Sequence, residues 1–312
     1  MAESSATIVF IAGPTASGKS AAALEMAQAL GGEIVNADSM QVYRDLRILT
    51  ARPSPQDLER ARHHLFGHVD AATSCSAGMW ARQAAQAIAD IAAREEVAIV
   101  VGGTGLYFRA LSEGLSPVPE VPNDVRAAVR RRCEEIGSEA FRAELLARDP
   151  GAARLSPADV QRHIRAAEVL EATGRPLAEF QSMARESLIP TLAAKIVIEP
   201  DRETLYRDCD ARFDRMLAAG ALEEARAFKG RALDPSLPAM KALGVAELVS
   251  HLQGQMTLAD AAELAKRNTR RFAKRQLTWF RNQTPDWPRA SGPAEAVRVL
   301  ERQLSAAAAK KT

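Results

Sequence analysis

Near its start the chain reads Gly13-Pro14-Thr15-Ala16-Ser17-Gly18-Lys19-Ser20, which fits the phosphate-loop pattern G-x-x-x-x-G-K-[ST]. The apolar run Thr7 to Ala12 before it is typical of a buried strand, and the alanine-rich segment Ser20 to Leu30 after it is typical of a helix. A strand, glycine loop and helix in this order direct several backbone N–H groups and a positive helix end at one point. We therefore expect a di- or triphosphate here, with Lys19 on the outer phosphates and the Ser20 hydroxyl on Mg²⁺. An incidental glycine turn is a weak alternative, because both flanks fit as well.

Strand-like and helix-like segments alternate after this loop. Residues 33–38 and 97–101 are the apolar runs of two further strands, and residues 80–94 read as a helix between them. Alternation of this kind is typical of βαβ units. The sequence thus predicts an α/β fold with an open, mainly parallel sheet of the P-loop nucleotide-hydrolase type.

The alternation of strand-like and helix-like segments ends at the proline-rich segment 116–122. Residues 123 to about 184 then read as helix with short breaks, and Lys195 to Ile198 forms a strand that rejoins the sheet. We expect a core built from residues 1–115 and 189–312, and a helical insertion at 116–188. The core would end in C-terminal helices, the last long one at 258–280, with residues 1–6 and the tail from about Ser305 as loose ends.

The composition is that of an ordinary globular protein, with 312 residues, 47% of them hydrophobic and 26% charged. The three cysteines, Cys75, Cys133 and Cys209, are widely spaced, which favours reduced thiols in the cytoplasm over a disulfide framework or a zinc site. We expect no secretory signal and no membrane span. The histidines within 63–68 lack further ligands at metal-binding spacing, so a structural role is favoured.

Polar residues follow two of the expected strands. Asp38-Ser39 ends the second, and Gly102-Gly103-Thr104-Gly105 ends the third. Ligands of such sheets gather outside the carboxyl ends of the strands, so Asp38 is interpreted as a functional acid, with a turn-capping role as the alternative. The third strand lacks the Mg²⁺-binding Asp of motor ATPases and signalling GTPases, which favours a transferase over a nucleotide-driven switch.

The helix expected near the C-terminus is strongly basic, although the net charge of the chain is only +2. Residues 266–281 carry seven cations and no acid. One stripe at three- and four-residue spacing consists of Arg267, Arg270, Arg271, Lys274 and Arg281, opposite a packing face of Ala273, Leu277 and Phe280. A stripe without interleaved acids indicates binding to a phosphate backbone, with a solvated face as the alternative. Arginines of the insertion would extend this footprint: Arg126, Arg130, Arg131, Arg132, Arg142, Arg162 and Arg165.

Five blocks, in order, resemble the tRNA dimethylallyltransferases (isopentenyl-tRNA transferases), and the resemblance covers essentially the whole chain. The blocks are residues 13–20, Asp38-Ser39-Met40-Gln41-Val42-Tyr43-Arg44, Val101-Gly102-Gly103-Thr104-Gly105-Leu106-Tyr107, Gln161-Arg162-His163-Ile164-Arg165-Ala166-Ala167-Glu168-Val169, and Phe272-Ala273-Lys274-Arg275-Gln276-Leu277-Thr278-Trp279-Phe280-Arg281.

The resemblance implies transfer of a dimethylallyl group from its diphosphate to the exocyclic N6 of the adenosine 3′-adjacent to the anticodon, with Mg²⁺. It assigns the phosphate loop to the donor diphosphate, Asp38 to the general base and Thr104 to substrate placement, with Lys19 as the third catalytic residue. Arg212 resembles the family's diphosphate-contacting arginine, and Arg207 is an alternative. The expected protein is a cytoplasmic monomer that binds the anticodon stem-loop of tRNA and no membrane.

The same resemblance maps tRNA-contacting positions onto several segments. They are Asp38, Ser39, Met40, Gln41, Thr104, Arg126, Gln161, Arg162, His163, Ile164, Arg165, Lys241, Ala242, Leu243, Gly244, Val245, Ala246, Lys274, Arg275, Gln276, Leu277, Thr278, Trp279, Phe280 and Arg281.

The chain departs from the family pattern in two places. Ser20 stands where Thr is commoner, and residues 49–53 read Leu-Thr-Ala-Arg-Pro where Gly-Thr-Ala-Lys-Pro is usual. Three other functions stay open at this point. The first is a P-loop small-molecule kinase, and the second is an isopentenyltransferase that acts on free adenosine phosphates. Neither function would need the basic helix. An NTP-regulated RNA-binding protein does not explain why Asp38 and Thr104 converge on the loop.

Overall fold

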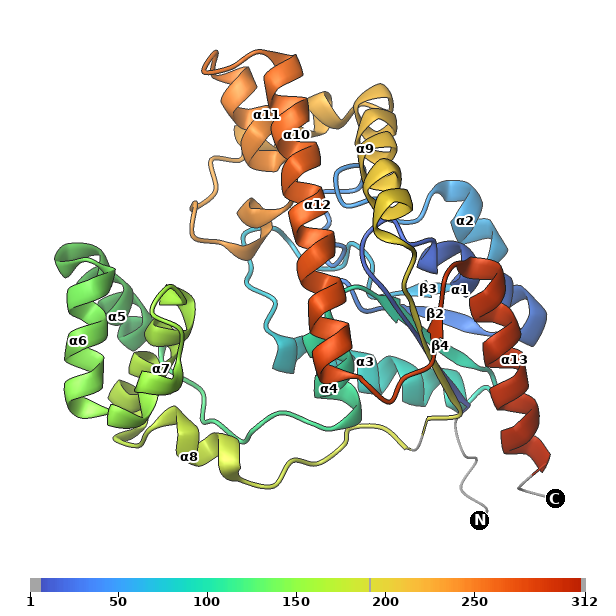
Figure 1. Ribbon diagram of the computed structural model, residues 1–312, viewed down its shortest axis with the longest axis horizontal. Helices are drawn as coiled ribbons and strands as arrows, with labels where there is room; N and C mark the ends of the chain where they lie inside the picture. Colours follow the sequence, from blue (N-terminus) through green and yellow to red (C-terminus); the bar gives the residue numbers. More distant parts are fainter. Residues whose placement is uncertain (1–6, 191, 310–312) are drawn as a thin grey trace. The chain divides into compact units, whose positions relative to one another are not determined.

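The structure, a computed structural model, describes residues 7–190 and 192–309 (Figure 1). It divides into two compact units, Met1–Ser112 with Ser187–Thr312, and Glu113–Glu186. The first unit carries the sheet and the phosphate loop, and the second is built from helices. The expectation for residues 1–6 lies outside the described residues.

The first unit is organised around a six-stranded sheet. Its strands are β1 (Ile8–Ala12), β2 (Glu33–Asn36), β3 (His63–His64), β4 (Ala98–Gly102), β5 (Ala194–Ile198) and β6 (Arg289–Ala290). They lie in the order β3-β2-β4-β1-β5-β6, and every neighbouring pair is parallel. The predicted α/β class is therefore confirmed. The edge strands β3 and β6 have two residues each, too few for a periodic pattern, and the sequence did not indicate them.

Alternation along the strands builds one core on each face of the sheet. In β1, Phe10 packs into one core while Val9 and Ile11 pack into the other, and β4 alternates in the same way. Successive side chains of a strand point to opposite faces, so a central parallel strand buried on both faces must be apolar throughout. This requirement explains why β1 and β4 were readable from their continuous apolar runs.

Helices cover both faces (Figure 1). In this unit they are α1 (Lys19–Leu30), α2 (Pro55–Arg60), α3 (Ala77–Ala92), α4 (Gly105–Ser112), α9 (Arg202–Ala218), α10 (Ala221–Gly230), α11 (Val245–Leu252), α12 (Leu258–Gln283) and α13 (Pro293–Ala309), with a 3₁₀ turn at Pro238–Lys241. None of the helices in the described ranges is both long and apolar enough to span a bilayer.

Helix α13 is the main departure from the sequence prediction, which placed the last long helix at 258–280 and a loose tail from about Ser305. Ala296, Val297 and Leu300 of α13 are buried in the same core as α1 and β5. These contacts stabilise the helix against one face of the sheet, and it continues past them to Ala309. Its alanine-rich end carried no strong signal of its own.

The second unit consists of α5 (Asn123–Ile136), α6 (Ser138–Arg148), a 3₁₀ turn (Pro150–Arg154), α7 (Val160–Thr173) and α8 (Leu177–Ser182). Val129, Cys133, Phe141 and Leu145 form part of its own apolar core. Its bounds, Glu113–Glu186, differ by a few residues from the 116–188 expected for the insertion.

Candidate functional site

The carboxyl ends of β1 and β2 open onto a cavity of about 520 Å³. Lys19 and Ser20 at the start of α1, Asp38 after β2 and Arg212 of α9 all line it. The cavity brings together a phosphate loop, an acid and an arginine that are far apart in the sequence. This is the position at which open parallel sheets bind their ligands.

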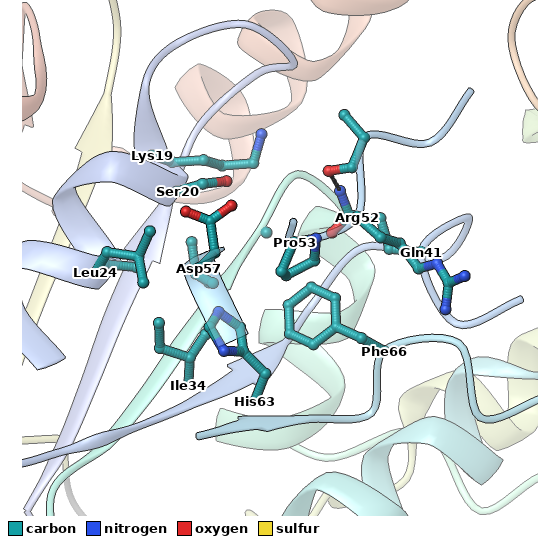
Figure 2. Close-up of a pocket in the computed structure, with 14 residues that line it drawn as sticks. Lys19, Ser20, Leu24, Ile34, Gln41, Arg52, Pro53, Asp57, His63 and Phe66 are labelled. Atoms are coloured by element: carbon teal, nitrogen blue, oxygen red, sulfur yellow. Dashed lines mark hydrogen bonds between the residues drawn. The ribbon is translucent and has the colours of Figure 1, made fainter. Parts of the chain in front are cut away.

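A smaller cavity of about 70 Å³ lies beside it and shares Lys19 and Ser20 (Figure 2). Figure 2 shows the Ser20 hydroxyl and the Asp57 carboxylate on one side of this space and Phe66 on another. Asp57 is also part of the N-terminal capping box of α2, because its Oδ2 accepts from the Ser54 amide at 2.9 Å.

Lys19 is a buried cation of the site. Burial lowers its pKa to about 8, against the attraction of Asp38 that raises it, and the positive charge of Arg212 lowers it further. Its ammonium group donates a hydrogen bond to the Pro14 carbonyl oxygen at 3.0 Å. A buried ammonium that is held only in part by an anionic partner favours the entry of an anion such as a phosphate.

The backbone of the phosphate loop is held in an unusual conformation. Ala16 has φ +62° and Gly18 has φ +84°, both in the left-handed region, which is unfavourable for alanine. The following helix starts without a side-chain cap, so its first amides are free to bind an anion. The buried Ser17 hydroxyl also has no hydrogen-bond partner among the described residues. These groups fit the loop's predicted role of binding phosphate.

Arg212 and Arg207 take different positions. Arg212 donates from Nη1 to the Thr15 hydroxyl at 2.8 Å and from Nη2 to the Thr50 carbonyl at 3.3 Å, and burial lowers its pKa. The Arg207 side chain is 71% exposed and pairs with its neighbour Asp208. Arg212 is therefore the arginine that lies at the loop.

Asp38 caps a turn and also lines the cavity. Its Oδ1 accepts from the Met40 amide at 2.9 Å. The fully buried Asn36 holds its backbone, because the Asp38 amide donates to Asn36 Oδ1 at 2.8 Å and Asn36 Nδ2 donates to the Asp38 carbonyl at 3.0 Å. Sequence reasoning missed Asn36, although a polar residue in an otherwise buried strand was a usable signal.

Thr104 fixes the same segment from β4. Its hydroxyl accepts from the Ser39 amide at 2.9 Å, and its amide donates to the Ala37 carbonyl at 3.1 Å. A Cβ on Gly102 would lie 2.0 Å from the Ala37 carbonyl oxygen, so glycine is required for this close approach. In the structure Thr104 thus positions the Asp38–Ser39 segment.

The oxygen donors of the site suit Mg²⁺. Mg²⁺ binds through one or two protein oxygens, substrate phosphates and water. The exposed Ser20 hydroxyl and the Asp38 carboxylate line one cavity and supply such oxygens. The described part of the chain contains no cluster of three or more His, Cys, Asp or Glu side chains. The histidines within 63–68 instead form hydrogen bonds to Ala61, Glu33 and Gln83.

The sequence predicts a basic stripe on α12 without acids beside it, but acids of neighbouring elements pair with several of its cations. Arg270 of α12 pairs with Asp210 of α9, and Lys266 pairs with Asp214, one turn further along α9. Arg281 pairs with Glu199. The sequence of α12 alone could not reveal these partners, because they come from other elements.

Four cations of α12 stay exposed at three- and four-residue spacing on one side of the helix, namely Arg267, Arg271, Lys274 and Arg275. Across residues 7–190 and 192–309 no acid lies within ion-pair distance of them. Some arginines of the insertion are also paired with acids: Arg162 pairs with Asp159, and Arg165 pairs with Glu168.

Several positions assigned to tRNA contact are buried, and their side chains are therefore unavailable to an RNA backbone in this structure. They are His163, Ala242, Gly244, Val245, Gln276, Leu277 and Phe280. Those exposed are Gln161, Arg162, Lys241, Ala246, Lys274, Arg275, Thr278 and Arg281, and the rest are half-buried.

The segment that departs from the family pattern is tied into the fold. Leu49 is buried in the core, and the Thr50 and Ala51 carbonyls both accept from Gln41 Nε2, at 2.8 and 2.9 Å. Arg52 donates to the Arg44 carbonyl at 3.0 Å. The leucine in place of glycine is accommodated by packing.

Comparisons with known proteins point to one family. A family described as IPP transferase matches residues 41–283. A tRNA dimethylallyltransferase of Nitrobacter hamburgensis is 54% identical over 302 residues, which cover 96% of this chain and 94% of that protein. One of Phenylobacterium zucineum is 54% identical over 283 residues, 90% of this chain and 92% of that protein.

Solved structures agree. The full-length tRNA isopentenylpyrophosphate transferase of Bacillus halodurans is 29% identical, with a TM-score of 0.68, and the match covers 98% of this chain and 99% of that one. A eukaryotic dimethylallyltransferase acting on tRNA is 28% identical, with a TM-score of 0.72, and the match covers 88% of this chain and 70% of that one.

The pKa of Lys19 predicts how anion binding depends on pH. Below pH about 8 the free protein carries the ammonium that an alkyl diphosphate needs, whereas above it binding must first take up a proton. The affinity for an alkyl diphosphate should therefore fall by up to about tenfold per pH unit above about 8. Calorimetry in buffers of different ionisation enthalpy would measure both the affinity and the proton uptake.

Lys19→Arg is the control, because its charge persists through this range. Its affinity should stay level between pH 7 and pH 9.5, apart from an overall loss. A wild-type affinity that is equally level, without proton uptake, would contradict the lowered pKa.

Proposed function

The chain belongs to the IPP transferase family, and from this premise we propose that it transfers a dimethylallyl group from dimethylallyl diphosphate to N6 of the adenosine 3′-adjacent to the anticodon of tRNA. The observation that carries the proposal is the convergence of Lys19, Asp38 and Arg212 on one cavity. Two cations face the leaving group there, and one acid is at hand for the proton of the nucleophile.

The donor diphosphate binds at the phosphate loop. The free amides at the start of α1, the Lys19 ammonium and Arg212 supply positive charge to the cavity. When the C1–O bond of the donor breaks, negative charge grows on the departing diphosphate. Groups already oriented toward that charge stabilise it most in the transition state. Bound Mg²⁺, held through Ser20 and the phosphate oxygens, would neutralise part of the same charge.

The acceptor is a weak nucleophile, since the lone pair of the adenine amino group is delocalised into the ring. As the bond from N6 to C1 forms, one N6 proton passes to the Asp38 carboxylate and the diphosphate leaves. The contacts of Asn36 and Thr104 hold Asp38 in position for this transfer. The product is N6-dimethylallyladenosine.

The target base is stacked in an anticodon loop, so it has to leave the stack to reach the cavity. We assign the grip on the RNA backbone to the exposed face of α12, with the arginine-rich insertion as a further contact. The enzyme would act as a monomer in the cytoplasm.

The direct test uses labelled dimethylallyl diphosphate, Mg²⁺ and an unmodified anticodon stem-loop. Label should enter the RNA, and a stem-loop with guanosine in place of the target adenosine should stay unlabelled because it lacks the N6 amino group. Transfer of label to free AMP but not to RNA would favour an isopentenyltransferase for free nucleotides. RNA-stimulated ATP hydrolysis without label transfer would favour a nucleotide-driven switch.

Asp38→Asn tests the general base. The amide keeps the shape of the side chain but accepts no proton, so single-turnover prenylation should slow by roughly a hundredfold or more. The affinity for tRNA should stay within severalfold. Rapid-quench measurements with saturating substrates would check this, and a variant with near-normal turnover would remove Asp38 from this role.

The exposed face of α12 predicts a salt-dependent affinity for tRNA. Replacing Arg271 and Lys274 together with Gln should weaken binding and make the log–log salt slope shallower by about 0.7 to 0.9 for each lost phosphate contact. Glutamine retains helix propensity, so the fold should persist. Titrations of tRNA at several salt concentrations would measure both quantities.

The matched control replaces Arg298 and Arg302, two exposed cations of α13, with Gln. This change removes the same charge from a helix whose apolar side packs on the other core of the sheet. The control should keep the wild-type slope. If the tRNA-binding curves of all three proteins coincided, the α12 face would be an ordinary solvated surface that does not bind tRNA.

A further inference from the structure

Thr15, in the phosphate loop, is held through every one of its polar groups. Its amide donates to Gln276 Oε1 at 2.8 Å, its hydroxyl accepts from Arg212 at 2.8 Å, and its carbonyl accepts from the Cys209 thiol at 4.0 Å. The three partners come from α9 and α12, which are about two hundred residues away or more in the sequence. The Thr15 amide is thus already paired and is not offered to a diphosphate.

Gln276 spans two loops of the site. While its Oε1 accepts from Thr15, its Nε2 donates to the Gly103 carbonyl at 2.9 Å, in the loop that also carries Thr104. The side chain is buried, with only 6% of its surface exposed. A Cβ on Gly103 would lie 2.2 Å from Gln276 Nε2, so the glycine leaves the space that this side chain fills.

The residue next to Thr15 also needs support. Ala16 adopts φ +62°, a conformation that costs an alanine on the order of 1 kcal/mol and persists only where the surroundings impose it. It packs against an apolar cluster that Leu205 and Cys209 of α9 form with Ala273 and Leu277 of α12. The same two helices therefore hold the hydrogen-bonding groups of Thr15 and the strained backbone beside it.

We propose that Gln276 is a positioning residue of the donor site: it fixes the phosphate loop to the Gly103–Thr104 loop and makes no contact with tRNA. The proposal rests on the proposed function and departs from the tRNA contact that the family resemblance assigns to this position. Opposite faces of α12 then serve the two substrates. Gln276 and its buried neighbours shape the donor loop, while Arg271 and Lys274 face outward to the RNA.

Gln276→Met tests the proposal, because methionine has nearly the same length and no strong hydrogen-bonding group. Binding of inorganic diphosphate to the free protein at pH 7 should weaken about three- to tenfold, as the loop loses its two fixed contacts. In kinetics with tRNA and dimethylallyl diphosphate, KM for the donor should rise while KM for tRNA stays unchanged. Unchanged diphosphate affinity together with weakened tRNA binding would overturn the proposal.

Gln303→Met is a closely matched control. Like Gln276, Gln303 of α13 uses both ends of its side-chain amide to bond the backbone, but both bonds go to one residue, Lys195. Its Oε1 accepts from the Lys195 amide at 3.1 Å, and its Nε2 donates to the Lys195 carbonyl at 3.0 Å. The Gln303→Met substitution should lower thermal stability without changing the affinity for diphosphate. An equal loss of diphosphate affinity in both variants would reduce the role of Gln276 to general stability.

Amide exchange in the wild-type protein provides a test that needs no variant. The Thr15 amide should be protected in the free protein and equally protected in the tRNA complex, because Gln276 stays on it. Loss of protection on adding tRNA would show that Gln276 turns to the RNA, and would overturn the proposal. If diphosphate binds as described but no RNA is prenylated, the proposed function fails while the role of Gln276 stands.

Discussion

The removal of the Lys19 ammonium from water is the constraint on which the rest of the site depends. An ion that loses its hydration must gain other partners or give up its charge, and the pKa of about 8 reflects that tension. The Pro14 carbonyl and the nearby Asp38 carboxylate supply part of the compensation. A bound anion would supply the remainder and so relieve a cost already present in the free protein.

That arrangement requires a loop whose shape does not relax. A glycine-rich loop on its own is flexible, and the left-handed backbone at Ala16 is unfavourable. Helices α9 and α12 hold the loop through Thr15 and through the apolar contacts of Ala16. Their own alignment is reinforced by the ion pairs of Asp210 and Asp214 with α12. Helices α9 and α12 therefore help to shape the phosphate loop, although its motif lies near the N-terminus.

A second feature of the site is a carboxylate whose position is fixed. Asp38 follows a short strand, and its segment is held from two sides, by the buried amide of Asn36 and by the hydroxyl of Thr104. Close approach of the β2 and β4 loops is possible because Gly102 has no side chain. Gly102 thus serves the geometry of the Asp38 segment, whereas Gly103 leaves space for Gln276.

The sequence by itself determined the fold class and the positions of the glycine-rich loop and of Asp38 at the ends of strands, because strand alternation, loop motifs and strand ends are local features of the chain. It did not reveal α13 or the two-residue edge strands, whose formation depends on the sheet they cover or extend. It also did not reveal which side chains of α12 are paired or buried. Whether Arg270 is free and whether Gln276 faces solvent depend on α9 and on the loops at the sheet edge. Charge pairing and burial arise between distant segments, so only the tertiary structure decided them.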